Sequence, residues 1–285
     1  MTVDRALRDS INHRLANLAA EQQVAPDRIR RHFVFQRILV RLSADDDTWV
    51  LKGGFALEVR LGLDARATKD LDLAMLEDLD GVEVQDRLLD ALDVDADDGL
   101  TFQVSAPRAT ASDEAGNPGW TFTVTSVLGG KVFASLRLDV VARSDEIAGA
   151  VGTIEVRPPI LAERLSSTAM PAVDVAQHAA EKFHAMARTY AGGRPSSRVK
   201  DLVDVVLLAE AGLLPHPDLA GRLQTVWQVR DGVPPPAQLP DFPAAWIGDY
   251  AAMAAELDLD IDYPTARSTA ERLFAEALAT EENQQ

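Results

Sequence analysis

The sequence predicts an α+β protein in which a small mixed sheet flanked by helices is followed by a C-terminal helical domain. Short alternating segments and a glycine hairpin turn occupy the first half of the chain, whereas apolar steps of three and four residues mark the second. With 285 residues, 47% of them hydrophobic, the chain is long enough for one large or two modest cores. We place the division at residue 150, which gives domains 1–150 and 151–285.

The N-terminal region is expected to be helical to about residue 42. Its first residues, 1–23, mix charged side chains with Leu and Ala and lack the apolar centre of a signal peptide. No later segment approaches the length and hydrophobicity of a membrane span. A cytoplasmic protein without a membrane partner is therefore the expectation.

A strand, a glycine turn and a short helix are predicted in succession. Residues 49–51 form a short apolar strand, Gly53 and Gly54 follow it, and residues 55–61 form a helix that Gly62 ends. A residue without Cβ lets a ligand approach the backbone, and the N-terminus of a helix favours anions. The turn is therefore a candidate phosphate-binding site.

Alternating polar and apolar residues from Asp70 to Met75 predict a strand with Asp70 and Asp72 on one face. Two carboxylates about 4 Å apart repel by about 4 kcal/mol at an effective dielectric of about 20, so the pair favours a bound cation. Mg²⁺ or Mn²⁺ would take these carboxylates together with water and phosphate oxygens. Such a pair is also common on a solvated strand face, and that alternative stays open.

A hairpin is predicted over residues 120–141 with Gly129-Gly130 as its turn. Arg137 and Asp139 share one face of its second strand, opposite three apolar residues. Asp139 is therefore a candidate third carboxylate for the metal. An ordinary surface position is an equally good interpretation of Asp139 from the pattern alone.

An amphipathic helix is predicted over residues 173–190, because an apolar stripe recurs at helical spacing. The stripe consists of Ala176, Ala179, Phe183, Met186 and Tyr190. Lys182 lies at its edge, where a lysine commonly extends into solvent. The next helix opens with the polar residues Arg198, Lys200, Asp201 and Asp204. Lys200 and Asp204 have the spacing of a simple i,i+4 ion pair.

Taken in order, these motifs resemble those of the AbiEii/AbiGii (MenT-like) nucleotidyltransferase toxins of bacterial type IV toxin–antitoxin systems. That family is a branch of the DNA-polymerase-β-type nucleotidyltransferases. The first match is made by Gly53, Gly54, Leu57, Thr68, Asp70 and Asp72. The second and third are EKFHAMAR at residues 181–188 and RVKDLVD at residues 198–204, so the resemblance spans roughly residues 30–210.

The resemblance implies a nucleotidyltransferase core and assigns roles to its motif residues. The implied catalytic residues are Asp70, Asp72, Lys182 and Asp201, and the implied metal ligands are Asp70, Asp72 and Asp139. The implied nucleotide-binding residues are Gly53, Gly54, Thr68, Lys69, Lys182, Arg198 and Lys200. The cofactor would be Mg²⁺ or Mn²⁺, and a nucleoside triphosphate would be the substrate.

The implied activity is transfer of a nucleotide to RNA, in characterised relatives the 3′ end of tRNA, which blocks translation. A winged-helix antitoxin is the implied partner. Two alternatives remain from the residues: a transferase that modifies a small molecule or a protein, and a nucleotide-binding protein without turnover. The fifteen residues between Gly54 and Asp70 are a longer interval than in generic DNA-polymerase-β-type transferases.

The net charge of −17 opposes an RNA substrate, because nucleic-acid binding normally requires a basic surface. Two local clusters could provide one. The first consists of Arg28, Arg30, Arg31, His32, Arg37 and Arg41, and the second of Arg188, Arg194, Arg198 and Lys200. Each is also compatible with a solvated helix face. The absence of cysteine excludes disulfides and thiolate metal sites.

Overall fold

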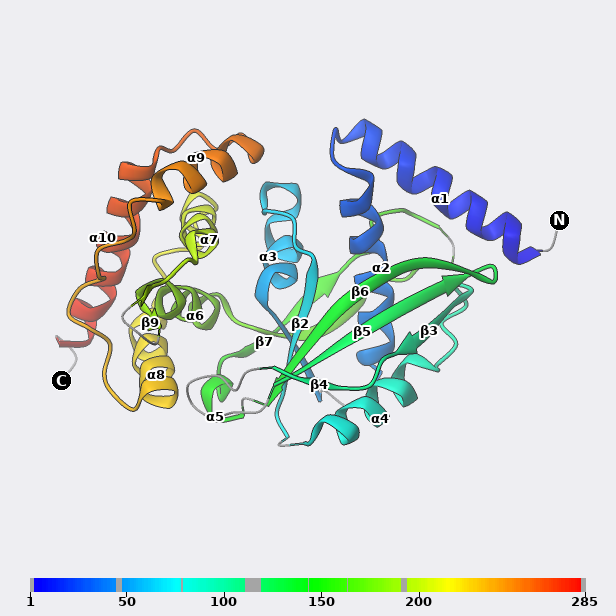
Figure 1. Cartoon of the computed structure of the whole chain (residues 1–285), viewed down its shortest axis with the longest axis horizontal. Coiled ribbons are helices and arrows are strands. Elements are labelled where there is room, and N and C mark those ends of the chain that lie inside the picture. The colour runs from blue at the N-terminus through cyan, green and yellow to red at the C-terminus, as the bar shows by residue number, and fades with distance from the viewer. Residues whose placement is uncertain are drawn as a thin grey trace. The chain divides into compact units, whose positions relative to one another are not determined.

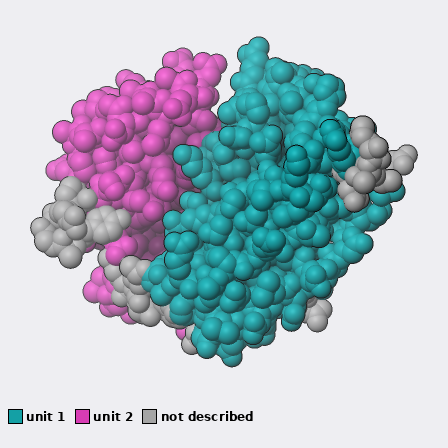
Figure 2. All heavy atoms as spheres, turned by 45° about the vertical axis from the view of Figure 1, so that its right-hand side comes forward, with its two compact units in different colours: residues 1–60, 67–144, 151–172 teal, residues 61–66, 145–150, 173–285 magenta. Residues whose placement is uncertain are grey.

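The computed structural model describes residues 3–44, 48–77, 79–110, 119–142, 144–162, 164–190 and 194–282. The chain forms two compact units, coloured separately in Figure 2. Unit 1 comprises residues 1–60, 67–144 and 151–172, and unit 2 comprises residues 61–66, 145–150 and 173–285. Both units are therefore assembled from separate stretches of the sequence.

Helices and strands follow one another as labelled in Figure 1. The helices are α1 Val3–Glu21, α2 Pro26–Leu42, α3 Gly53–Leu61, the 3₁₀ helix η1 Gly62–Asp64, α4 Gly81–Leu92, α5 Ser144–Ile147, α6 Val175–Ala187, α7 Val199–Glu210, α8 Leu219–Asp231, α9 Trp246–Glu256 and α10 Tyr263–Glu282. The strands are β1 Trp49–Lys52, β2 Asp70–Met75, β3 Leu100–Val104, β4 Arg108–Ala109, β5 Gly119–Leu128, β6 Lys131–Ala142, β7 Val151–Val156, β8 Thr168–Val173, β9 Thr189–Tyr190 and β10 Arg194–Pro195.

The main sheet of unit 1 has the order β3-β5-β6-β2-β1-β8-β7, with β4 paired to β5. It is mixed, because β2 runs antiparallel to β1 but parallel to β6. Strand pairs β5–β6 and β3–β5 are antiparallel. The predicted α+β class, with a mixed sheet flanked by helices, is confirmed.

One face of this sheet packs on helices α2 and α4. Alternate residues of β5 and β6, such as Phe122 and Leu138, share a core with Phe33 of α2 and Leu88 of α4. Figure 1 shows α2 lying behind β5 and β6. The hairpin turn is tight because Gly129 and Gly130 both have positive φ, 58° and 73°. The opposite face is left to the polar residues of these strands.

Local signals in the sequence set several helix boundaries. Pro26 occupies the first turn of α2, where its missing N–H costs nothing. Asp80 and Glu83 form a capping box at the start of α4. Asp174 caps α6 by accepting a hydrogen bond from the backbone N–H of Gln177. No helix among the described residues is long and apolar enough to cross a membrane.

Unit 2 is mainly helical, with α6 packed against α7 and α8 around aromatic side chains. The ring centroids of Phe183 and Phe274 lie 5.4 Å apart, and those of Trp227 and Phe274 lie 5.9 Å apart. The sequence assigned all of residues 151–285 to a helical domain. That assignment missed β7 and β8, which complete the main sheet of unit 1. The division into domains at residue 150 stays a prediction.

The first basic cluster in the sequence is largely structural. Arg37 and Arg41 of α2 are fully buried, and both donate hydrogen bonds to the carboxylate of Asp98, at 2.6 and 2.8 Å. Burial would raise the pKa of Asp98, but the hydrogen bonds and charge of Arg41, helped by Arg37, hold it below its usual value. For these two arginines, neither the RNA-binding nor the solvated-face interpretation was correct.

We expect Asp98→Asn to lower the free energy of unfolding by about 3 kcal/mol or more, because two buried guanidinium groups lose their counter-ion. Asp97→Asn is the matched control, since Asp97 is exposed and its ion pair with Arg164 lies at the surface. Urea denaturation of both variants checks the expectation. In the wild type, the contribution of the Asp98 ion pairs to the free energy of unfolding should decrease as pH falls through the lowered pKa of Asp98. Equal losses of unfolding free energy in Asp98→Asn and Asp97→Asn would contradict the structural role of the buried Asp98 carboxylate.

Candidate active site

The two carboxylates of the first motif lie side by side on β2. Asp70 and Asp72 are half-buried, whereas Leu71, between them, and Leu73, which follows, are buried in the core. This is the alternation that the sequence predicted for a strand with one polar face. The parallel pairing with β6 places Asp139 directly across from Asp72. The three predicted carboxylates therefore belong to neighbouring positions of one sheet face.

The glycine turn lies directly against this acidic pair. Gly53 begins α3 with a φ of +62°, which side chains rarely adopt. A Cβ on Gly53 would come within 2.0 Å of Asp72 Oδ2, so only glycine leaves room for the carboxylate. Gly54 is buried in the first turn of the same helix. The predicted convergence of glycine turn and carboxylates is therefore present in the backbone geometry.

Lys52 is a neighbour of the acidic pair that we did not assign from the sequence. It ends β1 and pairs in antiparallel register with Asp72, so both residues lie on the same side of the sheet. Its side chain is largely buried. The only available signal was its place immediately before the glycine pair, which by itself does not reveal a strand partner.

Asp139 is engaged by two side chains of the sheet. Its Oδ1 atom accepts hydrogen bonds from Arg137 Nε at 3.0 Å and from Thr121 Oγ1 at 2.5 Å. The hydrogen bond to Asp139, with the charges of Asp139, Asp70 and Asp72, raises the pKa of Arg137. Within the described part of the chain, no three His, Asp or Glu side chains form a ready metal-binding group. The role of Asp139 as a metal ligand therefore stays a prediction.

Thr68 is held in place by α2 and α3 rather than exposed to a ligand. Arg31 donates from Nε to the carbonyl oxygen of Thr68 at 3.0 Å, and Glu58 accepts from its backbone N–H. Burial raises the pKa of Glu58 despite the opposing charge of Arg28, whose Nε lies 3.1 Å from its carboxylate. The Thr68 hydroxyl donates to the carbonyl of Asp70 at 3.2 Å. Lys69, between Thr68 and Asp70, is exposed.

The second and third motifs meet in unit 2 as a network of charges. Lys182 Nζ lies 2.8 Å from Asp201 Oδ1 and 2.9 Å from Asp204 Oδ2. Arg66 binds Asp204 through Nε and Nη2, at 2.8 and 3.0 Å. Arg198 donates to Asp201 Oδ2 at 2.7 Å. Each buried carboxylate of α7 is therefore bound by two cations.

The electrostatics of this network fix its protonation. Burial lowers the pKa of Lys182, but Asp201 and Asp204 more than offset this and raise it. In turn, Lys182 and the neighbouring arginines hold the pKa of both carboxyl groups below the usual value, against the effect of burial. All three groups are therefore charged at neutral pH. Arg66 was missed by the sequence analysis, because it is not itself a motif residue and its partner Asp204 lies far along the chain.

Two simple interpretations of these motifs are corrected by the structure. The side chain of Lys182 is only 9% exposed, so it does not extend into solvent. Asp204 binds Lys182 and Arg66, whereas Lys200 forms no ion pair with any residue of the described ranges. Burial and the charge of Arg198 lower the pKa of Lys200. Lys200 is therefore a cation of α7 without an ion pair among the described residues.

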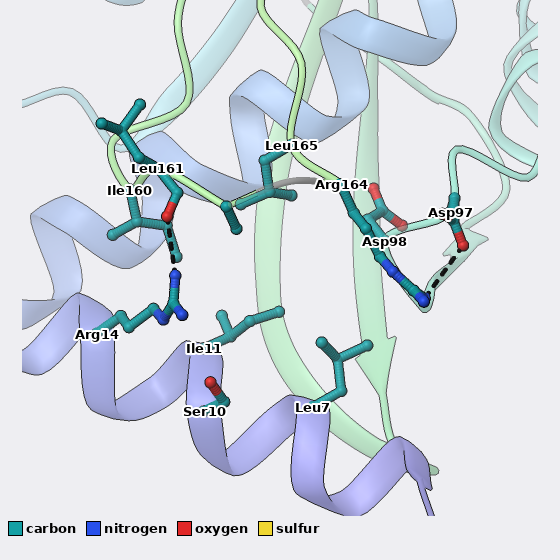
Figure 3. Close-up of a pocket in the computed structure, with 11 residues that line it drawn as sticks. Leu7, Ser10, Ile11, Arg14, Asp97, Asp98, Ile160, Leu161, Arg164 and Leu165 are labelled. Atoms are coloured by element: carbon teal, nitrogen blue, oxygen red, sulfur yellow. Dashed lines mark hydrogen bonds and ion pairs between the residues drawn. The ribbon is translucent and has the colours of Figure 1, made fainter.

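A separate cavity of about 580 Å³ opens in unit 1 between α1 and residues 160–162, 164 and 165, as shown in Figure 3. Aliphatic and charged side chains line it, and the charged ones have protein partners: Arg14 donates to the carbonyl of Leu161, Arg164 pairs with Asp97, and Asp98 binds Arg37 and Arg41. The cavity contains none of the predicted site residues.

Comparison with known proteins identifies relatives over most of the chain. A family model described as the nucleotidyl transferase AbiEii toxin of type IV toxin–antitoxin systems matches residues 37–278. The fold is similar to that of JHP933 from Helicobacter pylori, with 18% identity, coverage of 90% of this chain and 95% of that chain, and a TM-score of 0.52. No curated protein sequence matches the chain.

The fold is also similar to that of MenT4, a nucleotidyltransferase toxin from Mycobacterium tuberculosis H37Rv. The two chains share 20% identity, the match covers 94% of this chain and 98% of the other, and the TM-score is 0.51. At this level of identity the likeness concerns the fold.

We expect Gly53→Ala to destabilise the protein more than Gly130→Ala. Both glycines have positive φ, so each alanine incurs about 1–2 kcal/mol of backbone strain. Only at Gly53 does the new methyl group also meet a side chain, because a Cβ at Gly130 has no atom within 4 Å. Urea unfolding measures the difference. If both variants lose the same stability, the close packing of Gly53 on Asp72 is not a real constraint.

We also expect Lys182→Met to cost about 3 kcal/mol or more of unfolding free energy, because buried Asp201 and Asp204 lose a shared cation. Lys200→Met, which removes a neighbouring cation without an ion pair, should change stability by about 0.5 kcal/mol or less. Thermal and urea unfolding check both. A small loss in Lys182→Met would show that the network does not support unit 2.

Proposed function

Because this chain belongs to the AbiEii nucleotidyl transferase toxin family of type IV toxin–antitoxin systems, we propose that it transfers a nucleotide from a nucleoside triphosphate to RNA. The 3′ end of tRNA is the proposed acceptor, and a block of translation is the proposed outcome. The single observation that carries the proposal is the convergence of Asp70 and Asp72 with Gly53 in unit 1.

Asp70 and Asp72 fit a hard divalent cation, Mg²⁺ or Mn²⁺. They supply two carboxylates on one strand face, and Mg²⁺ commonly binds through one or two carboxylates with water and substrate phosphates as its other ligands. When bound, the metal would neutralise the charge that develops on the phosphates. Asp139 is the proposed third ligand. It would have to exchange its contacts with Arg137 and Thr121 for the metal.

The reaction we propose is attack of an acceptor hydroxyl on the α-phosphorus of the triphosphate. A new oxygen–phosphorus bond forms, and the bond to pyrophosphate breaks. The protein contributes mainly by holding the reacting groups in position. In unit 1, the Gly53 turn lies against the Asp72 carboxylate, and the contacts of Arg31 and Glu58 with Thr68 fix the start of β2.

The cations of unit 2 are proposed to bind the phosphates of the nucleotide. Lys200, which has no ion pair with a described residue, is the first candidate, and half-exposed Arg198 is the second. Lys182 is proposed to act with them, held in a fixed orientation by Asp201 and Asp204. Asp201 is thereby proposed as a catalytic residue that orients Lys182.

Membership of a type IV system implies that an antitoxin is the partner of this toxin. We propose that the antitoxin is a small winged-helix protein. The gene next to the one for this chain is the simplest place to look for it. A neighbouring gene of another fold would argue against that assignment while leaving the transferase proposal intact.

We expect the wild-type protein to incorporate radiolabelled nucleotide into total RNA or tRNA when each of the four triphosphates is supplied with Mg²⁺. Asp70→Asn should reduce this by about 100-fold or more, because a metal ligand and its charge are lost. Asp86→Asn is the control, since Asp86 is an exposed residue of α4. It should retain wild-type incorporation.

The same assay separates the alternatives. Label in a small molecule or a protein, with none in RNA, would support a transferase with another acceptor. Triphosphate binding in calorimetry without pyrophosphate release would support a nucleotide-binding protein without turnover. Incorporation that survives Asp70→Asn would remove the basis of the proposed site.

A further inference from the structure

The sheet face that carries Asp70 and Asp72 continues across β6, β5 and β4. Asp72 pairs with Asp139, Asp139 with Thr121, and Thr121 with Arg108. In the next row, Asp70 pairs with Arg137, and Arg137 with Thr123. Because residues paired across strands point to the same side, these rows form one surface. We name its part beyond the carboxylates, Arg108, Thr121, Thr123 and Arg137, the acceptor face.

The acceptor face is solvent-accessible and cationic. The side chain of Arg108 is exposed, and it forms no hydrogen bond or ion pair with any other residue that the structure describes. The Arg137 side chain is 52% exposed and held by Asp139 and Thr121, at 3.0 and 3.3 Å. Two guanidinium groups with hydroxyl groups between them are therefore presented on one side of the sheet.

Carboxylates are missing from the adjoining row. That row consists of Gln103, Thr125 and Ser135, which pair across β3, β5 and β6. The whole chain has 45 acidic and 28 basic residues. On these rows of the sheet the only acidic residues are Asp70, Asp72 and Asp139, so beyond them the face carries less negative charge than the chain does on average. A polyanion would meet less repulsion on these rows than the net charge suggests.

Guanidinium and hydroxyl groups are the usual partners of phosphate and sugar oxygens in nucleic-acid complexes. From Asp72 the row extends over three strand spacings to Arg108, about 14 Å. A strand whose reacting end lies at the carboxylates would therefore have its preceding phosphates over Thr121 and Arg108. Arg137 lies beside that path, in the row of Asp70.

We propose that the acceptor face binds the phosphodiester backbone of a single-stranded acceptor RNA next to its reacting end. The inference rests on the proposed function, because that function places the reaction at Asp70 and Asp72. Arg108 and Arg137 bind phosphate oxygens, and Thr121 and Thr123 bind phosphate or sugar oxygens. The face contacts the acceptor rather than the nucleoside triphosphate.

The test measures binding of a fluorescent single-stranded RNA oligonucleotide by anisotropy at several salt concentrations. Arg108→Gln is the informative variant, because the Arg108 side chain contacts none of the carboxylates in the site. It should weaken binding about tenfold and reduce the slope of log K against log salt by about 0.7, as expected for one lost phosphate contact. Arg137→Gln should weaken binding as well, but it also releases Asp139.

Arg87→Gln is the matched control. It changes the charge by the same amount, but α4 packs on the other face of the sheet, and Arg87 pairs with Glu77 there. This variant should bind RNA like the wild type. Equal weakening in Arg87→Gln and Arg108→Gln would mean that net charge alone governs binding, and it would overturn the acceptor face. Wild-type binding in Arg108→Gln would overturn it as well.

A steady-state assay separates this inference from the proposed function. In nucleotide transfer, Arg108→Gln should raise the KM for RNA about tenfold and leave kcat and the KM for the triphosphate unchanged. If RNA binding depends on Arg108 but the wild type transfers no nucleotide, the proposed function is refuted and the acceptor face is supported. Transfer to RNA that is insensitive to Arg108→Gln would keep the function and refute the surface.

Discussion

The contact between Gly53 and the carboxylate of Asp72 is the constraint on which the arrangement of unit 1 depends. It requires a residue without a side chain, and it requires a backbone angle that glycine accepts readily. Strand β1 must then end and α3 must begin at this point, so that β2 can place its carboxylates beside the turn. The rest of the sheet extends this geometry, since β6 and β5 continue the rows that start at β2.

The two units hold their acidic residues in different ways. Asp201 and Asp204 are fully buried, and each is neutralised by two cations of unit 2. Asp70 and Asp72 are only half-buried, on a polar sheet face that also carries Arg137, which is bound to Asp139. The first arrangement supports structure, because removing a partner leaves a buried charge. The second is the arrangement at which we propose that the metal binds.

Local patterns in the sequence were sufficient for the elements around the site. The alternation at Asp70 and Asp72 and the glycine turn at Gly53 depend on a few adjacent residues, and the structure contains both as predicted. The hairpin whose second strand carries Asp139 was also predicted, from its Gly129-Gly130 turn. Its place beside Asp72 comes from the parallel pairing of β6 with β2. These features belong to single elements or to neighbouring strands.

Residues whose role depends on distant contacts could not be predicted in the same way. Arg37 appears from its sequence to be part of an exposed basic helix, yet Asp98, far along the chain, binds it in the core. Arg66 and Lys52 have partners that only the folded chain reveals, and Arg108 becomes part of a row only through its pairing with Thr121. A periodic pattern says which face a residue occupies, but not what lies opposite.

The discontinuous course of the chain has a consequence for attempts to isolate unit 2. Residues 61–66 and 145–150 belong to it, although both segments are flanked by parts of unit 1. A fragment that starts after residue 172 would keep Asp204 and Lys182 but lack Arg66, and it would also lack Glu146, the partner of Arg230. No single cut in the sequence yields either unit whole. Each unit therefore has to be expressed as part of the full chain.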